Sequence, residues 1–221
     1  AKGRGPEPQY RLLWQRLEGE EMSIKIEGFS GGDRTNLNLP SVQEKLLDAV
    51  TTTGKPVIVV LTSGGALSVN KAQEKAAAVL LAGYGGQQGG NAVADVLFGD
   101  YNPAGRLPVT YYKSIDQIPA FENYDMTGKT YRFFNQEPLY PFGYGLSYTT
   151  FSYSNLVIPE KATAGDKISA KVTVTNTGKV EGDEVVQIYL TDEKASTPRP
   201  IRQLEGFSRI NLKPGESKVI E

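Results

Sequence analysis

The sequence predicts an α/β domain with a mainly parallel sheet, followed by a β-sandwich. Between residues 41 and 98, segments with helical spacing alternate with a buried-strand pattern, whereas from residue 168 onward apolar and polar residues alternate with a period of two. Between these regions, residues 140–151 (YPFGYGLSYTTF) contain five aromatic residues, two glycines and a proline. This composition is typical of an ordered, buried connector and not of a helix or a strand.

The expected elements of the α/β part follow one another in the order of an alternating fold. A helix should begin near Ser41, which forms a capping box with Glu44 after Pro40, and should end at Gly54. Residues 57–65 (VIVVLTSGG) predict a parallel strand that is buried on both faces. Residues 71–81 are rich in Ala, Glu and Lys and predict a helix, and residues 91–98 predict another after the glycine-rich turn 83–90.

The second part predicts a sandwich of the immunoglobulin or fibronectin type. Strands are expected in residues 168–176 and 184–192, and a turn followed by a strand start in residues 213–221. We therefore divide the chain into domains 1–148 and 149–221. A complete module of this type has roughly 100 residues and only about 70 remain, so we expect the sandwich to be truncated. The irregular first residues likewise suggest a fragment whose upstream portion is missing.

Composition excludes several kinds of chemistry. The chain has 221 residues, a formal net charge of −1 and a sequence pI near 5.8, so we expect neither nucleic acid nor an anionic membrane as partner. It contains no cysteine and no histidine, which excludes disulfides, catalytic thiolates, Ser-His-Asp triads and His-ligated zinc. We predict no cofactor and no metal. The compartment is not determined, although a periplasmic or secreted location is favoured over the cytoplasm.

Carboxylates are the best candidates for acid/base chemistry. Glu18, Glu20 and Glu21 are crowded together in the stretch LEGEE. Crowding of like charges raises the pKa of one carboxyl group, and a carboxylic acid with a raised pKa can protonate a leaving-group oxygen. The alternative is a solvated acidic turn. Asp33 and Arg34 follow, and this pair could orient a ligand hydroxyl or simply form a local salt bridge or helix-entry cap.

Two further features have both a functional and a structural interpretation. The turn 83–90 (GYGGQQGG) could bind an anion at a helix start, but it lacks the lysine of a P-loop, so tight helix packing explains its glycines better. Aromatic side chains could stack on a sugar ring, although core or interface packing is the commoner role. These aromatic residues are Tyr124, Tyr131, Phe133 and Phe134.

Several motifs, in their order along the chain, resemble the C-terminal part of glycoside hydrolase family 3. The most specific are FGDYNPAGRLPVT (98–110) and YPFGYGLSYTTF (140–151). The others are LEGEEM, GGDRTNLNLP, GKPVIVVLTSGGAL, TYRFF, NTGKVEGDEVVQIYL and PRPIRQLEGF, and the resemblance covers nearly everything from residue 17 to residue 221. The LEGEEM and GGDRT pieces are similar to those of the bacterial β-xylosidases and β-glucosidases of that family.

The resemblance implies an exo-acting retaining β-glycosidase. In that family an N-terminal barrel supplies an Asp nucleophile, an α/β sandwich domain supplies the acid/base Glu, and a fibronectin-like domain follows. Glu18 matches the acid/base position, with Glu20 and Glu21 as alternates, while Asp33 and Arg34 match a motif adjacent to the substrate site. The chain departs from the family where RLLWQR replaces a strand of the type VVVVG, and where residues 83–88 replace WYPGQE.

The expected function follows from this resemblance. A longer parent enzyme, with its missing N-terminal barrel, would remove terminal β-linked xylose or glucose from oligosaccharides, and the isolated chain would be nearly inert. The main alternative is a non-catalytic carbohydrate-binding or structural fragment. A nucleotide-binding α/β protein is a third possibility that rests on the glycine turn alone.

Overall fold

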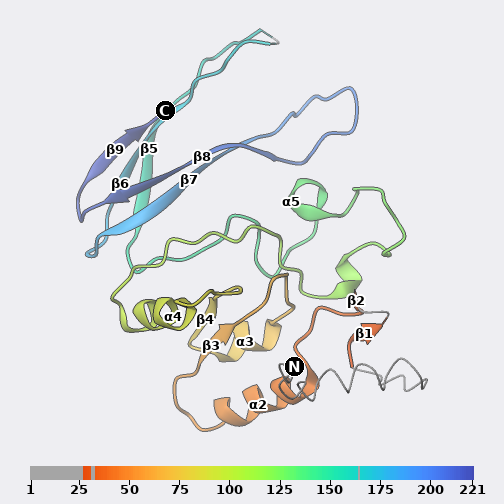
Figure 1. The fold of residues 1–221 in the computed structure, drawn as a ribbon. Coiled ribbons are helices and arrows are strands. Elements are labelled where there is room, and N and C mark those ends of the chain that lie inside the picture. The colour runs from red at the N-terminus through yellow and green to blue at the C-terminus, as the bar shows by residue number, and fades with distance from the viewer. Residues whose placement is uncertain (1–26, 31–32, 164) are drawn as a thin grey trace, which may run out of the picture. The chain divides into compact units, whose positions relative to one another are not determined.

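The computed structural model describes residues 27–30, 33–163 and 165–221. The chain divides into two compact units, Ala1–Asn36 and Leu37–Glu221. In the described part of the first unit, strands β1 (Phe29–Ser30) and β2 (Asp33–Arg34) pair antiparallel. The second unit contains the remaining described elements, which are drawn in Figure 1.

Helix α2 (Ser41–Thr51) begins where the sequence predicts, but the expected capping box is not formed. Pro40 is the N-cap residue, because its carbonyl accepts the first helical hydrogen bond, from the amide of Glu44. The Glu44 carboxylate lies instead 3.0 Å from the Lys71 ammonium group. An ion pair with a neighbouring helix has thus replaced the local cap.

Strand β3 (Ile58–Leu61) and strand β4 (Ala78–Leu81) form a parallel pair in which Ile58 lies opposite Ala78 and Leu61 opposite Leu81. The prediction of a parallel strand is therefore confirmed. The expectation that both faces of this strand are buried is wrong. Leu61 is 6% exposed, whereas Ile58, on the opposite face, is 50% exposed.

The helix predicted for residues 71–81 is only half right. Helix α3 spans Asn70–Lys75, its C-cap residue Ala76 is already extended with a ψ of 147°, and the apolar residues that follow form β4. Ala and Leu favour helices in isolation, but pairing with β3 provides hydrogen bonds and burial that outweigh this weak preference. The predicted helix at residues 91–98 is confirmed as α4 (Gly89–Phe98), which ends at Gly99 with φ of +87°.

A hydrophobic core forms around these elements. Val69 is 1% exposed and Ala72 is fully buried, so α3 packs tightly against its neighbours. The other buried members of this core are Leu47, Leu61, Leu67, Tyr111 and Leu139.

The segment after α4 has little regular structure. It includes only a 3₁₀ turn, η1 (Ile115–Gln117), and the short helix α5 (Thr130–Phe133) among described elements. A backbone bridge joins Tyr111 to Tyr140. The connector 140–151 is ordered and irregular, as predicted, but it is not uniformly buried, because Leu146 is 71% and Tyr148 51% exposed.

A two-sheet β-sandwich completes the second unit (Figure 1). One sheet has the order β5-β6-β9 and the other consists of β7 and β8, with all pairs antiparallel. The strands are β5 (Phe151–Val157), β6 (Lys171–Asn176), β7 (Gly182–Leu190), β8 (Gln203–Leu212) and β9 (Ser217–Ile220). The expected strands are confirmed as β6, β7 and β9, whereas β5 and β8 were not predicted.

The sandwich core lies between the two sheets. Val174 and Leu212 are completely buried there, and Val186 and Ile210 complete the cluster. Asn176 is also fully buried, and its amide donates 2.9 Å hydrogen bonds to the carbonyls of Val180 and Leu212. These bonds satisfy a polar group that would otherwise be costly to bury.

Candidate functional site

The residues expected to transfer protons lie outside the described residues. Glu18, Glu20 and Glu21 all fall within residues 1–26. Their assignment as acid/base candidates therefore stays a prediction.

The residues expected beside the site form a short hairpin. Arg34 pairs with Phe29 and Asp33 with Ser30 through their backbones. The amide of Thr35 donates a 2.8 Å hydrogen bond to the carbonyl of Gly28, which closes the base of this hairpin. Asp33 and Arg34 are thus strand residues and not a helix-entry cap, since the next helix begins only at Ser41.

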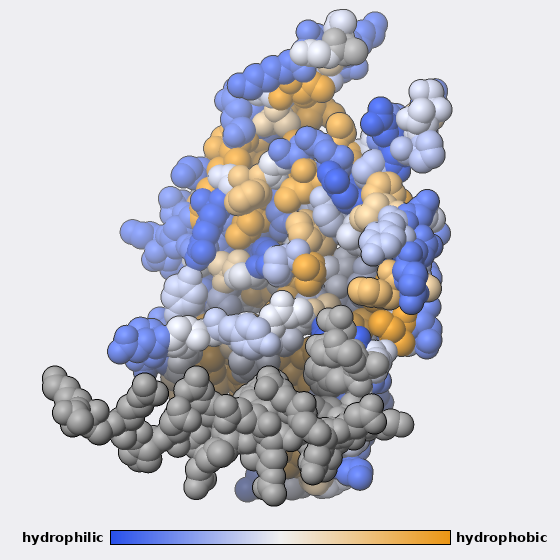
Figure 2. Space-filling view, turned by 45° about the vertical axis from the view of Figure 1, so that its right-hand side comes forward, coloured by the Kyte–Doolittle hydropathy of each residue, from blue (hydrophilic) through white to orange (hydrophobic). Residues whose placement is uncertain are grey.

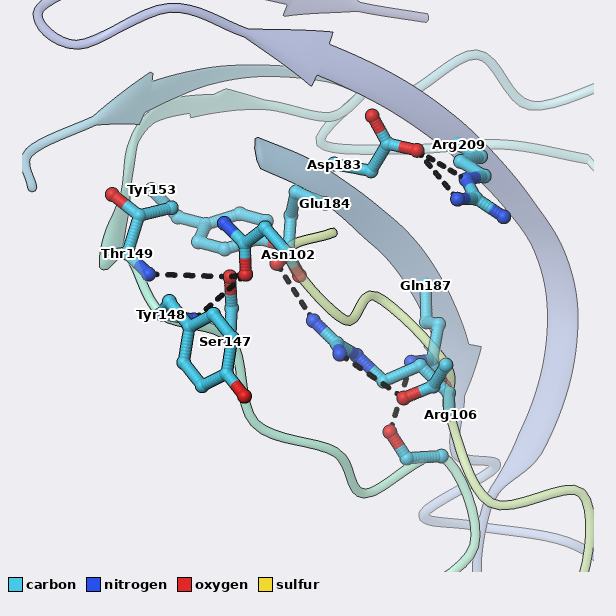
Figure 3. A network of polar contacts seen from close by, with 12 residues as sticks. Asn102, Arg106, Ser147, Tyr148, Thr149, Tyr153, Asp183, Glu184, Gln187 and Arg209 are labelled. Atoms are coloured by element: carbon cyan, nitrogen blue, oxygen red, sulfur yellow. Dashed lines mark hydrogen bonds and ion pairs between the residues drawn. The ribbon is translucent and has the colours of Figure 1, made fainter. Parts of the chain in front are cut away.

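A polar network joins the α/β part to the sandwich within the second unit, and we call it the junction network (Figure 3). Its members come from the loop after α4, the end of the connector, and strands β5, β7 and β8. They are Asn102, Arg106, Ser147, Tyr148, Thr149, Tyr153, Asp183, Glu184, Gln187 and Arg209.

The centre of the junction network is a buried ion pair. The Nη2 atom of Arg106 lies 2.8 Å from Oε2 of Glu184, and the two side chains are only 13% and 11% exposed. The hydroxyl of Tyr153 donates a 2.8 Å hydrogen bond to the other carboxylate oxygen. Burial, and then the neighbouring Glu184 carboxylate, raise the pKa of Tyr153 well above its ordinary value. Both oxygens of Glu184 are engaged, so this carboxylate is placed for structure and not for proton transfer.

Asn102 holds the end of the connector in place. Its side-chain oxygen accepts hydrogen bonds from the hydroxyl of Ser147 (2.9 Å) and the amide of Tyr148 (2.8 Å). Its amide group donates a 3.0 Å bond to the carbonyl of Glu181, next to β7. One side chain therefore links three segments that are far apart in the sequence.

A more exposed pair lies at the edge of the network. Arg209 donates hydrogen bonds to Asp183 (2.7 Å) and to the hydroxyl of Tyr101 (2.7 Å). The amide of Asn211 donates a further 2.8 Å bond to Asp183. The bond from Asn211, together with Arg209, holds the pKa of Asp183 below its ordinary value.

An open cleft of about 390 Å³ lies beside the buried pair. Its lining mixes aromatic and polar side chains. Gln187 donates a hydrogen bond to the carbonyl of Gly143, and the guanidinium of Arg202 lies 5.7 Å from the ring centre of Tyr189. Most polar groups of the cleft are therefore committed to contacts within the protein.

The aromatic residues considered as sugar platforms have different environments. Tyr131 stacks on Phe142 with ring centres 4.2 Å apart, and Phe134 is 8% exposed and meets Tyr112 edge to face at 4.9 Å. These rings serve packing. Tyr124 is different, because 88% of it is exposed.

The glycine-rich turn before α4 is explained by close packing. A side-chain carbon on Gly85 would lie 2.8 Å from the Cα atom of Gly89, a distance that real contacts do not reach. This backbone approach favours the packing interpretation over anion binding.

The buried pair was not foreseen from the sequence. Arg106 and Glu184 are 78 positions apart, and neither belongs to a local pattern that marks burial. The only signal was their place within the family-like motifs FGDYNPAGRLPVT and NTGKVEGDEVVQIYL.

Within the described residues, no group of three or more metal-ligating side chains is found. The same part of the chain contains no helix with the length and hydrophobicity needed to cross a membrane.

The fold combines an α/β domain with a fibronectin-like β-sandwich, and the junction network holds these two parts together. Comparison with known families agrees with this description. Residues 11–148 match the family model of the glycosyl hydrolase family 3 C-terminal domain, and residues 184–221 match that of the fibronectin type III-like domain. The chain belongs to glycosyl hydrolase family 3.

Relatives of the chain carry the names of β-glycosidases. A xylan 1,4-β-xylosidase of Xylanibacter ruminicola is 48% identical over 91% of this chain and 23% of its own length. A periplasmic β-glucosidase of Salmonella typhimurium is 42% identical over 98% of this chain and 31% of its own length. The chain thus spans between 23% and 31% of these two relatives.

Solved structures show the same fold. The β-glucosidase of Listeria innocua in complex with glucose superposes with a TM-score of 0.76 at 33% identity, covering 86% of this chain and 28% of that chain. A β-glucosidase of Erythrobacter marinus gives a TM-score of 0.75 at 43% identity, covering 88% and 26%.

Proposed function

We propose that the chain acts as the C-terminal part of an exo-acting retaining β-glycosidase, a β-xylosidase or β-glucosidase that removes terminal β-linked sugars from oligosaccharides. The observation that carries this proposal is the family match over residues 11–148, which includes the LEGEE stretch. The names of the two relatives, a β-xylosidase and a β-glucosidase, support the same class of reaction.

The proposed mechanism assigns one carboxyl group to this chain. A retaining enzyme needs two carboxyl groups about 5–5.5 Å apart, one that attacks the anomeric carbon and one that protonates the leaving oxygen. Glu18 would donate this proton and then, as a carboxylate, take a proton from the water that hydrolyses the glycosyl-enzyme. The nucleophile would come from the N-terminal part of the longer protein.

Asp33 and Arg34 are proposed to lie beside the substrate. Their support is the match to the family motif together with the hairpin, which fixes the backbone of both residues. We also propose domain borders at 1–148 and 149–221. This division is supported by the family match, which ends at residue 148, and by strand β5, which begins at Phe151.

Three matched substitutions in the complete gene product test the acid/base assignment. Glu18→Gln, Glu20→Gln and Glu21→Gln are compared on an alkyl xyloside or glucoside and on a dinitrophenyl glycoside. Loss of the true acid/base should lower kcat/KM on the alkyl glycoside by about 100- to 10,000-fold. The dinitrophenyl glycoside should be much less affected in its first step, because its leaving group needs no proton.

Azide separates the acid/base residue from a residue that only maintains the fold. Azide needs no general base, so it should attack the glycosyl-enzyme of the Glu18→Gln variant, restore turnover of the dinitrophenyl glycoside and yield the β-glycosyl azide. Rescue of Glu20→Gln or Glu21→Gln alone would move the role to that residue. If azide rescues none of the three variants, the acid/base residue does not lie in the LEGEE stretch.

The isolated 221-residue chain should be nearly inert on aryl β-xylosides and aryl β-glucosides, because it would supply only one of the two carboxyl groups. The measurement is release of nitrophenol by purified chain and by its Glu18→Gln variant. Turnover that the substitution abolishes would show that both groups lie in this chain. Binding of xylobiose without hydrolysis would instead favour a carbohydrate-binding module.

A further inference from the structure

The cleft between the connector and strand β7 lies wholly within the second unit, and we call it the connector cleft. The residues that matter for its chemistry are Phe142 and Tyr144 of the connector, Gln187 and Tyr189 of β7, and Arg202 just before β8. Its volume of about 390 Å³ is within the range of small-molecule sites. Figure 2 shows hydrophobic and hydrophilic residues interspersed over one face of the protein, so hydrophobicity alone does not mark a binding site here.

The aromatic side chains of the connector cleft are held in place by neighbouring rings. Phe142 stacks on Tyr131 with ring centres 4.2 Å apart, and Tyr144 stacks on Tyr140 with ring centres 5.3 Å apart. Tyr144 is still 38% exposed, and its hydroxyl makes no hydrogen bond to a described residue. Because these rings are already ordered, a flat ligand that packs on them loses little affinity to the ordering of side chains.

Hydrogen bonds fix the connector against β7. The side-chain amide of Gln187 donates a 3.2 Å bond to the carbonyl of Gly143, and its oxygen accepts a 2.6 Å bond from the hydroxyl of Tyr189. The amide of Gly143 donates a 2.8 Å bond to the carbonyl of Leu107. The connector cleft is therefore already formed without a ligand.

Charge gives the connector cleft its selectivity. The charged residues that line it are Arg106, Glu184 and Arg202. Arg106 and Glu184 neutralise each other across 2.8 Å, as Figure 3 shows. The positive charge of Arg202 has no counter-ion among the described residues.

The guanidinium group of Arg202 is available to a ligand. It lies 5.7 Å from the ring centre of Tyr189, and none of its N–H groups donates a hydrogen bond to a described residue. A guanidinium group can rest on an aromatic face and still bind a carboxylate through two parallel hydrogen bonds. A ligand with a single negative charge would neutralise Arg202, whereas a cation would be repelled. A phosphate monoester carries about 1.5 to 2 negative charges and would leave an excess.

We propose that the connector cleft binds a carboxylate that is carried by a sugar ring or an aromatic ring. The carboxylate pairs with Arg202, and the ring packs among the aromatic side chains of the cleft. Two kinds of molecule have this chemistry, the hexuronic acids and the hydroxycinnamic acids. The inference does not depend on the proposed function, because every residue of the cleft belongs to the second unit and no bond of the ligand is broken.

Calorimetric titration of the complete gene product tests this site. The ligands are methyl glucuronoside and p-coumarate, and each is compared with its neutral methyl ester. We expect at least one of the two carboxylates to bind. Its methyl ester should bind at least about tenfold more weakly, because the ester cannot form the charge-assisted hydrogen bonds to the guanidinium group.

A pair of arginine substitutions locates the binding. Arg202→Gln removes the charge from the connector cleft. Arg199→Gln is the matched control, because Arg199 is an exposed arginine in the same loop that does not line the cleft. We expect Arg202→Gln to weaken binding of the carboxylate by at least about tenfold, and Arg199→Gln to stay within about twofold of wild type. Circular dichroism shows that both variants are folded.

Each outcome decides the proposal. Binding of the glucuronoside alone identifies a uronic acid as the ligand, and binding of p-coumarate alone identifies an aromatic acid. Absence of binding by wild type, equal binding of acid and ester, or equal binding by Arg202→Gln and Arg199→Gln would overturn it. Displacement of the carboxylate by an equal concentration of inorganic phosphate would also overturn it, since the site would then bind any anion. None of these measurements requires hydrolysis, so a failure of the proposed function would not affect them.

Discussion

Replacing Arg106 with methionine should strongly destabilise the second unit, because it leaves the Glu184 carboxylate buried without its counter-ion. Removing one partner of a buried ion pair costs about 3–5 kcal/mol. Tyr153 still donates a hydrogen bond to Glu184 in the variant, and the paired side chains keep 13% and 11% exposure. We therefore expect Arg106→Met to lower the free energy of unfolding by about 3 kcal/mol, the lower end of this range.

The expected loss converts into a measurable change in melting temperature. For a domain of this size, 1 kcal/mol corresponds to about 2–4 °C, so Arg106→Met should lower Tm by about 6–12 °C. The matched control is Arg209→Met, which breaks the pair with Asp183 in a position where the arginine side chain is 54% exposed. An exposed pair contributes at most about 1 kcal/mol, so the control should lose no more than about 4 °C. Thermal unfolding followed by circular dichroism provides the comparison.

A double-mutant cycle shows whether the loss comes from the uncompensated charge. Glu184→Gln removes the charge but keeps the shape, and the variant Arg106→Met/Glu184→Gln should be more stable than Arg106→Met alone. Equal losses for Arg106→Met and Arg209→Met would refute the reasoning, as would simple additivity of Arg106→Met and Glu184→Gln. Either result would mean that water reaches the pair.

Two further predictions concern acid sensitivity and a crowded glycine. The hydrogen bond from Asn211 contributes most to lowering the pKa of Asp183 below 3.8, so its stabilisation is present above about pH 4 and is lost as the pH falls through the folded-state pKa. Asp183→Asn should therefore flatten the acid limb of a Tm-against-pH profile, and an unchanged limb would contradict this role. Gly143 has a φ of +79° and an added Cβ atom would collide with the side-chain oxygen of Gln187, whereas Gly54 has a φ of +72° and open space around it. Denaturant titration should show Gly143→Ala to be at least about 1 kcal/mol more destabilising than Gly54→Ala, which suffers only the backbone strain; equal losses would show that Gln187 simply moves away.

The sequence predicted most elements correctly where the local preference of the residues and their contacts in the fold favour the same conformation. Residues 57–61 are apolar and mostly β-branched, so strand β3 (Ile58–Leu61) follows from propensity, although only one of its faces is buried. Residues 76–81 are the opposite case, because their alanines and leucines favour a helix while the adjacent β3 offers a parallel partner. The helix prediction failed there because tertiary pairing decided the conformation.

Strands β5 and β8 were not predicted because their sequences lack clean alternation. In β5 (FSYSNLV) six of the seven residues are exposed, and β8 (QLEGFSRINL) carries the apolar Phe207 on an exposed position. The junction network was missed for a different reason. Its central contact joins two residues that are 78 positions apart, and such a contact leaves no trace in local spacing.

The connector 140–151 identified the family from sequence, and its hydrogen bonds show why its composition is unusual. The amide of Gly143 donates to the carbonyl of Leu107, and the amide of Leu107 donates to the carbonyl of Tyr144. A side chain on Gly145 would meet the carbonyl of Gly105, so glycine is required where the two backbones touch. On its other side, Gly143 accepts a hydrogen bond from Gln187 of β7.

The connector therefore does not act as a flexible linker. It is fixed between residues 105–107 and the β7 strand, and the buried Arg106–Glu184 pair spans the same region. Because these contacts are specific and partly buried, the sandwich and the α/β part should move as one body, in contrast to domains joined by polar, exposed linkers. Substitutions in the connector would then act on stability through the junction, because its glycines and its hydrogen bonds hold the two parts together.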